Sequence, residues 1–276
     1  MAGPLLEARN LTKHYGQVRA LDGASFTVLP GEVTALIGDN GAGKSTLVKS
    51  LSGAIRPDSG DILINGQPVQ LSSPLDARDH GIETVYQDLA LAPDLDAAAN
   101  LHLGREIYRV PFLRVLSRKQ MRRQAVAAFA ELGIDLPDPG APVASLSGGQ
   151  RQSVAVARAV AFASSVVFMD EPTAALGVVQ RSRVLDTVRR VRDRGVAVVL
   201  ISHNMPEVLA VSDRIEVLRL GRRVARFAAA DASVEDLVGA MTGAITTQDS
   251  TADNPADDNP ADDNPADDPP EAGHDD

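Results

Sequence analysis

The chain has 276 residues, of which 44% are hydrophobic and 23% are charged, and its formal net charge is −10 at pH 7. This length is sufficient for one or two domains with a sizeable core. The absence of cysteine excludes disulfides and thiolate metal sites. No run of 18 uncharged apolar residues occurs and the first ten residues lack the pattern of a signal peptide, so we expect neither a membrane span nor secretion.

The negative charge is concentrated at the C-terminal end. Residues 246–276 contain eleven Asp or Glu and no Lys or Arg, and removing these charges from the total of −10 leaves about +1 for residues 1–245. A nearly neutral domain argues against nucleic acid as a partner. The repeated A-D-D-N-P segment has no apolar residue larger than alanine, which predicts a disordered acidic tail at 246–276 after a domain at 1–245. An arm that binds cations or a partner is the alternative for the tail.

The first third of the chain has the pattern of short strands and turns. Alternating apolar and polar residues predict strands within 5–28, and the apolar run 33–37 predicts a buried strand. Residues 57–66 predict a hairpin with an Asn-Gly turn. We expect a short helix at 74–80 and a further strand at 81–87.

The remaining elements alternate between helices and strands. Residues 88–162 have helical spacing, most clearly at 118–132, and predict a helical insertion without strands. Beyond it, the expected elements are a strand at 165–171, a helix at 178–194, a strand at 196–203, a hairpin at 214–227 and a helix at 234–241. This alternation predicts an α/β fold with a parallel sheet covered on both faces.

The segment G-D-N-G-A-G-K-S at 38–45 follows the strand at 33–37 and precedes a helix. It has the spacing of a phosphate-binding loop, in which backbone amides and a helix N-terminus surround a phosphate. A glycine-rich turn that merely contains a lysine is the alternative, but it would not require this strand and helix. The residues expected to contact the nucleotide are Gly38, Asp39, Asn40, Gly41, Ala42, Gly43, Lys44, Ser45 and Thr46. Lys44 would reach the terminal phosphates, and the Ser45 hydroxyl would bind Mg²⁺.

Two buried strands are followed by residues suited to hydrolysis. Asp170 and Glu171 end the strand at 165–171, at the edge where ligands bind in parallel sheets. We expect Asp170 to hold Mg²⁺ and Glu171 to polarise the attacking water. His203 ends the strand at 196–203, and its position favours contact with the γ-phosphate. The alternatives are a surface acidic pair and a structural histidine.

A second glycine-containing segment, L-S-G-G-Q at 146–150, begins a long helix. Ser147 and the amides of Gly148 and Gly149 would bind phosphate oxygens at the positive end of that helix. An ordinary serine N-cap followed by flexible glycines is an equally good interpretation of these residues alone.

Taken together, loop 38–45, Gln87, L-S-G-G-Q, the strand with Asp170 and Glu171, and His203 resemble the ATP-binding subunit of ABC transporters over about residues 5–243. The resemblance implies a P-loop NTPase (RecA-like) core with an N-terminal antiparallel β subdomain and a helical subdomain at about 88–162. It also implies that Tyr15 stacks on adenine and that Gln87 senses Mg²⁺ and the membrane subunit. The implied homodimer closes head to tail, so that Ser147, Gly148, Gly149 and Gln150 of one subunit contact ATP in the other.

The stretches 73–91, 100–106 and 201–208 are similar to those of the simple-sugar importers of the ribose and fructose type. That similarity implies a subunit on the cytoplasmic face of the cell membrane, which hydrolyses Mg-ATP to drive a separate permease supplied by an extracellular sugar-binding protein. The permease would dock around residues 87–105.

One position departs from the family pattern. Gly177 stands where the family has an aspartate that links the two ATP sites of the dimer. We still expect hydrolysis, because Glu171 and His203 are present. Two other functions remain open: a regulatory ATP-binding module with low turnover, and a soluble ABC ATPase that acts on nucleic acid or ribosomes.

Overall fold

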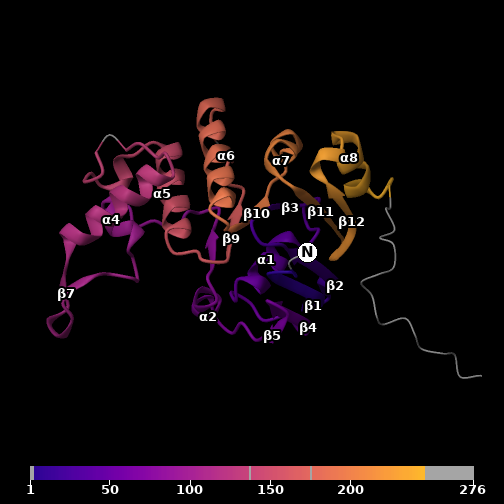
Figure 1. Cartoon of the computed structure of the whole chain (residues 1–276). Coiled ribbons are helices and arrows are strands. Elements are labelled where there is room, and N and C mark those ends of the chain that lie inside the picture. The colour runs from indigo at the N-terminus through magenta and orange to yellow at the C-terminus, as the bar shows by residue number, and fades with distance from the viewer. Residues whose placement is uncertain (1–2, 137, 175, 246–276) are drawn as a thin grey trace, which may run out of the picture.

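The computed structural model describes residues 3–136, 138–174 and 176–245 (Figure 1). Helices α5 to α8 lie above a six-stranded sheet, and a smaller antiparallel sheet lies below it. This is the expected α/β architecture with an antiparallel β subdomain and inserted helices. The predicted acidic tail, 246–276, lies outside the described residues.

The smaller sheet has the strand order β2-β1-β4-β5 and is antiparallel. Its strands are β1 (Leu6–Tyr15), β2 (Val18–Val28), β4 (Ser59–Ile64) and β5 (Gln67–Val69). Asn65 and Gly66 connect β4 to β5 with φ angles of 50° and 76°. Positive φ at both residues is typical of the two-residue turn that joins twisted strands. The predicted strands within 5–28 and the Asn-Gly hairpin are confirmed.

The larger sheet has the order β12-β11-β3-β10-β9-β6. Its strands are β3 (Val33–Ile37), β6 (Ile82–Val85), β9 (Val166–Asp170), β10 (Ala197–Ile201), β11 (Arg214–Arg219) and β12 (Arg222–Ala228). Five strands run parallel, and only β12 pairs antiparallel, through its hairpin with β11. The predicted parallel sheet is confirmed, and it ends in one antiparallel edge strand.

Successive residues of the central strands enter two different cores. Phe168 and Val199 pack in the cluster that contains Leu47 of α1 and the smaller sheet. Met169 and Leu200, their neighbours in sequence, pack in the cluster formed with α5 and α6. Because strand side chains alternate between the two faces and both faces are buried, these strands are apolar throughout instead of alternating.

The helices are α1 (Lys44–Leu51), α2 (Pro74–Asp79), α3 (Ala97–Leu101), α4 (Arg118–Glu131), α5 (Gly148–Val160), α6 (Val178–Asp193), α7 (Met205–Val211) and α8 (Val234–Thr242). The helices expected at 74–80, 118–132, 178–194 and 234–241 are confirmed to within two residues. Helix α7 was not predicted, because its seven residues are too few for a clear apolar period. No helix in the described ranges is long and apolar enough to cross a membrane.

The prediction that residues 88–162 contain no strand is wrong at one place. A small hairpin, β7 (Tyr108–Val110) and β8 (Val115–Leu116), lies between α3 and α4. Its strands of three and two residues are too short to give an alternating pattern in a segment whose composition is helical. Whether residues 88–162 form a separate subdomain stays a prediction, since α5 shares one apolar core with β9 and β10.

Candidate active site

The loop at 38–45 joins β3 to α1 and is shaped by its glycines. Gly38 has a φ of 152° and Gly43 a φ of 103°, in the region where side chains are strained. A Cβ on Gly38 would lie 2.2 Å from the Leu218 carbonyl oxygen, and a Cβ on Gly43 would lie 2.4 Å from the Ala20 carbonyl oxygen. These contacts with β11 and β2 show why only glycine fits at both positions. Gly43 is also the N-cap of α1, so backbone amides are left free to face a ligand.

Lys44 extends back over this loop. Its Nζ donates hydrogen bonds to the carbonyl oxygens of Gly38, at 2.7 Å, and Asp39, at 3.1 Å. Burial lowers the pKa of Lys44, and the carboxylates of Glu171, Asp39 and Asp170 oppose that shift. The ammonium group is therefore held against the backbone of the loop, and it interacts electrostatically with Glu171 and Asp170 at the end of β9.

Asp170 and Glu171 lie beside the loop, at the C-terminal edge of the sheet. Asp170 is the last residue of β9 and pairs in register with Ile201 of β10, while the Glu171 amide donates to the Ile201 oxygen at 2.9 Å. Burial, and then the charge of Glu171, raise the pKa of Asp170. Glu171 has a φ of 50°, so the chain turns sharply and the two carboxylates leave it in different directions.

The sequence placed His203 at the same edge, and the structure brings it into contact with Glu171. Its Nδ1 lies 2.8 Å from Oε1 of Glu171, at hydrogen-bonding distance. The Glu171 side chain is 16% exposed and the His203 side chain is 74% exposed. The acid is thus held at the floor of the site, and the imidazole stays accessible to a ligand.

Gln87 and Tyr15 make no hydrogen bond with Lys44, Asp170, Glu171 or His203 in the described part of the chain. Gln87 is exposed in the turn after β6. Tyr15 ends β1 with 49% of its surface exposed, and Lys13 Nζ lies 5.9 Å from the centre of its ring. An exposed aromatic ring is suited to stacking on a flat base, which stays a prediction for Tyr15.

Ser147 forms the N-cap of α5, as expected if this segment is an ordinary serine N-cap. The Gln150 amide donates to the Ser147 hydroxyl at 3.3 Å, and the Ser147 amide donates to Oε1 of Gln150 at 2.8 Å, which makes a capping box. Gly148 is exposed, so its amide at the helix end is open to solvent. Within the described part of the chain, no hydrogen bond joins residues 147–150 to loop 38–45. The anion-binding role of this segment stays a prediction.

Comparison with known proteins identifies the family. The family model described as "ABC transporter" matches residues 21–174, which is more than half of the chain. The chain belongs to the ABC transporter family. It is 54% identical over 246 residues to the fructose import ATP-binding protein FrcA of Rhizobium meliloti, covering 87% of this chain and 95% of that protein. As an ATPase of the ABC family, it binds and hydrolyses ATP.

Other relatives and solved structures agree with this assignment. The xylose/arabinose import ATP-binding protein XylG of Sulfolobus acidocaldarius is 47% identical, with 86% of this chain and 94% of that protein covered. The ribose import ATP-binding protein RbsA 1 of Rubrobacter xylanophilus is 48% identical, but the match of 87% of this chain spans only 47% of its length. Among solved structures, cbiO1 of Clostridium perfringens, part of an ABC transporter complex, matches with a TM-score of 0.71 at 26% identity, covering 85% of this chain and 92% of that one.

Two features of this ABC ATPase escaped sequence analysis. Arg158 of α5 donates from Nη1 to the Ala90 oxygen at 2.6 Å and from Nη2 to the Leu89 oxygen at 2.8 Å, three and two residues after Gln87. Leu89 and Ala90 have φ angles of 58° and 45°, which are unfavourable for residues with side chains. In the sequence, Arg158 was only an interruption in an apolar run. The only sequence feature that could have indicated this role was the isolated charge of Arg158 in an otherwise apolar part of α5.

The second missed residue is Glu207 of α7. Its carboxylate accepts hydrogen bonds from the Thr173 hydroxyl at 2.6 Å and from Nδ2 of Asn204 at 2.9 Å. Arg181 Nη1 of α6 lies 3.6 Å away. Glu207 therefore ties the chain after Glu171 to the chain after His203. A glutamate in an unpredicted helix gave no signal for this role.

Gly177, where the family has aspartate, is the N-cap of α6 and supplies no capping side chain. A Cβ at this position would lie 2.8 Å from Oε1 of Gln180. The amide side chain of Gln180 thus occupies part of the space that a larger residue at 177 would need. Gln180 also lies close to Gly149, because a Cβ there would be 2.8 Å from Cγ of Gln180.

Proposed function

We propose that this ABC ATPase powers the import of a simple sugar through a separate membrane permease. The observation that carries the proposal is the identity of 54% to a fructose import ATP-binding protein over 95% of its length. The match covers 95% of that protein, whereas it covers 47% of the ribose relative. The family model matches one ATP-binding unit in this sequence, at residues 21–174, and a homodimer would supply the second unit that the proposed head-to-tail arrangement needs.

The position of residues 147–150 supports a head-to-tail dimer. Gly148 is exposed at the N-terminus of α5, and none of the described hydrogen bonds of this segment reaches its own phosphate-binding loop. A helix N-terminus with free amides attracts phosphate oxygens. In the proposed dimer, Ser147, Gly148, Gly149 and Gln150 complete the ATP site of the other subunit.

Within one subunit, the proposed catalytic residues are Glu171, His203, Lys44 and Gln87. Glu171 acts as the general base that orients water, and its contact with His203 at 2.8 Å restricts the rotamers of both side chains. His203 donates a hydrogen bond to the γ-phosphate. Lys44 exchanges its two backbone acceptors for phosphate oxygens and so stabilises the charge that develops during transfer. Tyr15 stacks on adenine, and the amides of residues 38–46 surround the phosphates.

The residues proposed to hold Mg²⁺ are Ser45, Gln87 and Asp170. Asp170 fits this role, because its half-buried carboxylate accepts no hydrogen bond from any other described residue and its pKa is raised mainly by burial. One carboxylate together with a hydroxyl, an amide and substrate phosphates is a typical Mg²⁺ environment. The ion would supply charge neutralisation at the β- and γ-phosphate oxygens.

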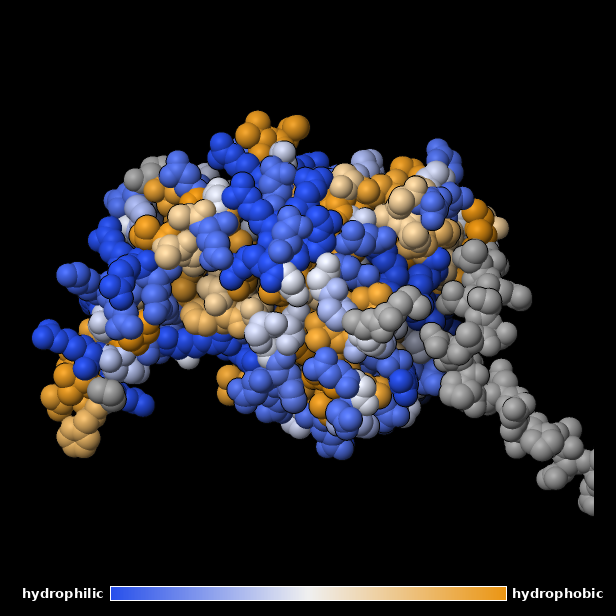
Figure 2. Space-filling model, viewed as in Figure 1, coloured by the Kyte–Doolittle hydropathy of each residue, from blue (hydrophilic) through white to orange (hydrophobic). Residues whose placement is uncertain are grey.

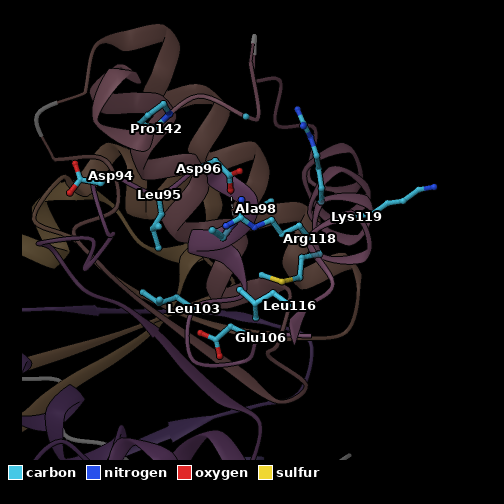
Figure 3. A pocket seen from close by; sticks show the side chains of 14 residues that line it. Asp94, Leu95, Asp96, Ala98, Leu103, Glu106, Leu116, Arg118, Lys119 and Pro142 are labelled. Carbon is cyan, nitrogen blue, oxygen red and sulfur yellow. Dashed lines mark hydrogen bonds between the residues drawn. The ribbon is translucent and has the colours of Figure 1, made fainter. Parts of the chain in front are cut away.

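A cavity beside α3 and α4 supports docking of the permease near the proposed surface at 87–105. It has a volume of about 780 Å³, and it is lined by apolar side chains and by charges of both signs. Figure 3 shows Leu103, Leu116 and Glu106 on one side of the opening and Leu95 and Pro142 on the other. An apolar hollow with a polar rim fits an amphipathic segment of another protein. We place the subunit on the cytoplasmic face of the membrane, with an extracellular sugar-binding protein delivering the substrate.

The test combines hydrolysis, dimerisation and uptake. The parent should hydrolyse Mg-ATP, and Glu171→Gln should lower the rate by at least about a hundredfold while forming a stable dimer with ATP. Glu131→Gln, at an exposed acid on α4, is the matched control and should behave like the parent. Cells that carry only the Glu171→Gln protein should lose uptake of fructose, ribose, xylose or arabinose. Unchanged uptake of all four sugars would refute the transport proposal, and unchanged hydrolysis would refute the role of Glu171.

A further inference from the structure

The β7–β8 hairpin projects from the end of the molecule that carries α4 (Figure 1). Tyr108 pairs with Leu116 and Val110 with Val115, and the Ser117 amide closes the base of the hairpin with a 2.7 Å hydrogen bond to the Ile107 oxygen. The two strands belong to no larger sheet among the described elements. A lone two-stranded hairpin is marginally stable in water, so contact with another phase or molecule would stabilise this one.

The hairpin exposes apolar side chains at its tip and along its two strands. Phe112 at the tip is 94% exposed and the adjacent Leu113 is 66% exposed. The other exposed apolar residues of the hairpin are Tyr108, Val110, Val115 and Leu116. Figure 2 shows the resulting hydrophobic tip standing clear of the body. Exposed apolar residues that occur singly are common, but a continuous group of six indicates an interaction surface.

The same segment is strongly basic. Residues 107–123 contain six Arg or Lys and no Asp or Glu. These exposed residues are Arg109, Arg114, Arg118, Lys119, Arg122 and Arg123. The chain as a whole carries a net charge of −10, so this local excess runs against the overall balance.

We propose that the β7–β8 hairpin inserts its apolar tip into the surface of a membrane rich in anionic lipids, with the neighbouring basic residues bound to the headgroups. The exposed Phe112 and Leu113 at the tip could enter the interfacial region of a bilayer, and the six basic residues at 107–123, with no acid among them, match the charge of anionic headgroups. Basic side chains around exposed Phe and Leu are typical of interfacial anchors.

The position of the hairpin is consistent with this partner. Leu116 and Lys119, at and just beyond its base, line the cavity that we assign to the permease (Figure 3). This orientation toward the membrane rests on the proposed function, because it assumes that the cavity receives a membrane protein. The lipid contact itself is a property of the isolated chain, so it is tested without the permease or ATP.

The test is co-sedimentation of the full chain with vesicles of phosphatidylcholine alone or mixed with phosphatidylglycerol, at low and physiological salt. The parent should bind only the anionic vesicles. Phe112→Ser with Leu113→Ser should lower binding at least about tenfold, since two large apolar side chains would be lost from the inserted tip. Arg109→Gln with Arg114→Gln should also lower it about tenfold and reduce the salt dependence, since four of the six basic residues remain. The matched control is Leu75→Ser with Leu220→Ser, which removes two side chains of 65% and 71% exposure elsewhere.

The outcomes separate this inference from the proposed function. All variants should keep the parental rate of ATP hydrolysis without vesicles, which shows that they fold. Equal binding to neutral vesicles, or equal loss in the Leu75 and Leu220 control, would overturn the proposal. Absence of vesicle binding by an active parent would do so as well, and would point to a protein contact for the hairpin. Failure of hydrolysis with intact vesicle binding would instead refute only the proposed function.

Discussion

Replacement of Arg158 tests whether one side chain of α5 holds the Gln87 loop in place. The guanidinium group donates to the Leu89 and Ala90 oxygens across almost 70 residues of sequence. Both acceptor residues have positive φ, a conformation that is unfavourable by roughly 1–2 kcal/mol for each such residue. The loop therefore keeps this shape only while other interactions compensate. We expect Arg158→Met to preserve the apolar packing of the stem while it removes both hydrogen bonds.

The expected loss of stability follows from those two bonds. A hydrogen bond from a charged donor contributes about 1.5–3 kcal/mol, and partial exposure of Arg158 favours the lower end, which gives about 3 kcal/mol for the pair. In a protein of this size each kcal/mol shifts the midpoint of thermal unfolding by about 2–4 °C, so the shift should be roughly 6–12 °C. Arg158→Lys, which keeps the charge but donates in one direction at a time, should lose about half as much.

The assays are urea unfolding, hydrogen exchange and steady-state hydrolysis. Faster exchange of the amides at 87–91 in the variant, with unchanged exchange in β9 and β10, would locate the effect at the loop. We expect kcat to fall about tenfold, because Gln87 would no longer be held in the position that we propose for it in the ATP site. Arg183→Met, at an exposed arginine of α6, is the control and should change neither property. A stability within 0.5 kcal/mol of the parent, or unaltered exchange at 87–91, would refute the reasoning.

Two further predictions concern the phosphate-binding loop and the free energy of unfolding at low pH. Gly43→Ala should weaken ATP binding at least about tenfold in equilibrium titration, because its Cβ would lie 2.4 Å from the Ala20 oxygen at a strained φ. Gly66→Ala, which is strained in the same way at a φ of 76° but has no atom within 4 Å and lies in the β4–β5 turn, should leave binding unchanged. Hydrogen bonds from the Lys13 ammonium and a backbone amide lower the pKa of Asp58 from 3.8 to about 2, so its stabilising contribution is complete above about pH 4 and is lost as the pH falls toward 2. In urea unfolding, the difference between the parent and Asp58→Asn should therefore shrink from pH 5 to pH 2, and a constant difference would contradict the assignment.

Sequence analysis predicted the local backbone structure around the candidate site, because each loop, turn and strand there is a property of a short segment. The glycine spacing of 38–45 is imposed by backbone conformation, and the Asn65-Gly66 turn follows from the φ angles that those residues tolerate. Apolar runs at 165–171 and 196–203 predicted buried strands. The positions of Asp170, Glu171 and His203 at one edge of the sheet followed from the common direction of parallel strands.

The side-chain contacts between these segments were decided only by the tertiary structure. The contact of Glu171 with His203 requires β9 and β10 to be neighbours in register, and the contact of Glu207 with Thr173 requires an additional short helix. The two hydrogen bonds from Arg158 to the loop after Gln87 depend on how α5 packs beside β6. Such contacts depend on distances between segments far apart in sequence, and residue spacing along the chain carries no information about them. The sequence by itself therefore indicated which residues are candidates for the nucleotide site, and the fold determined which side chains contact those residues.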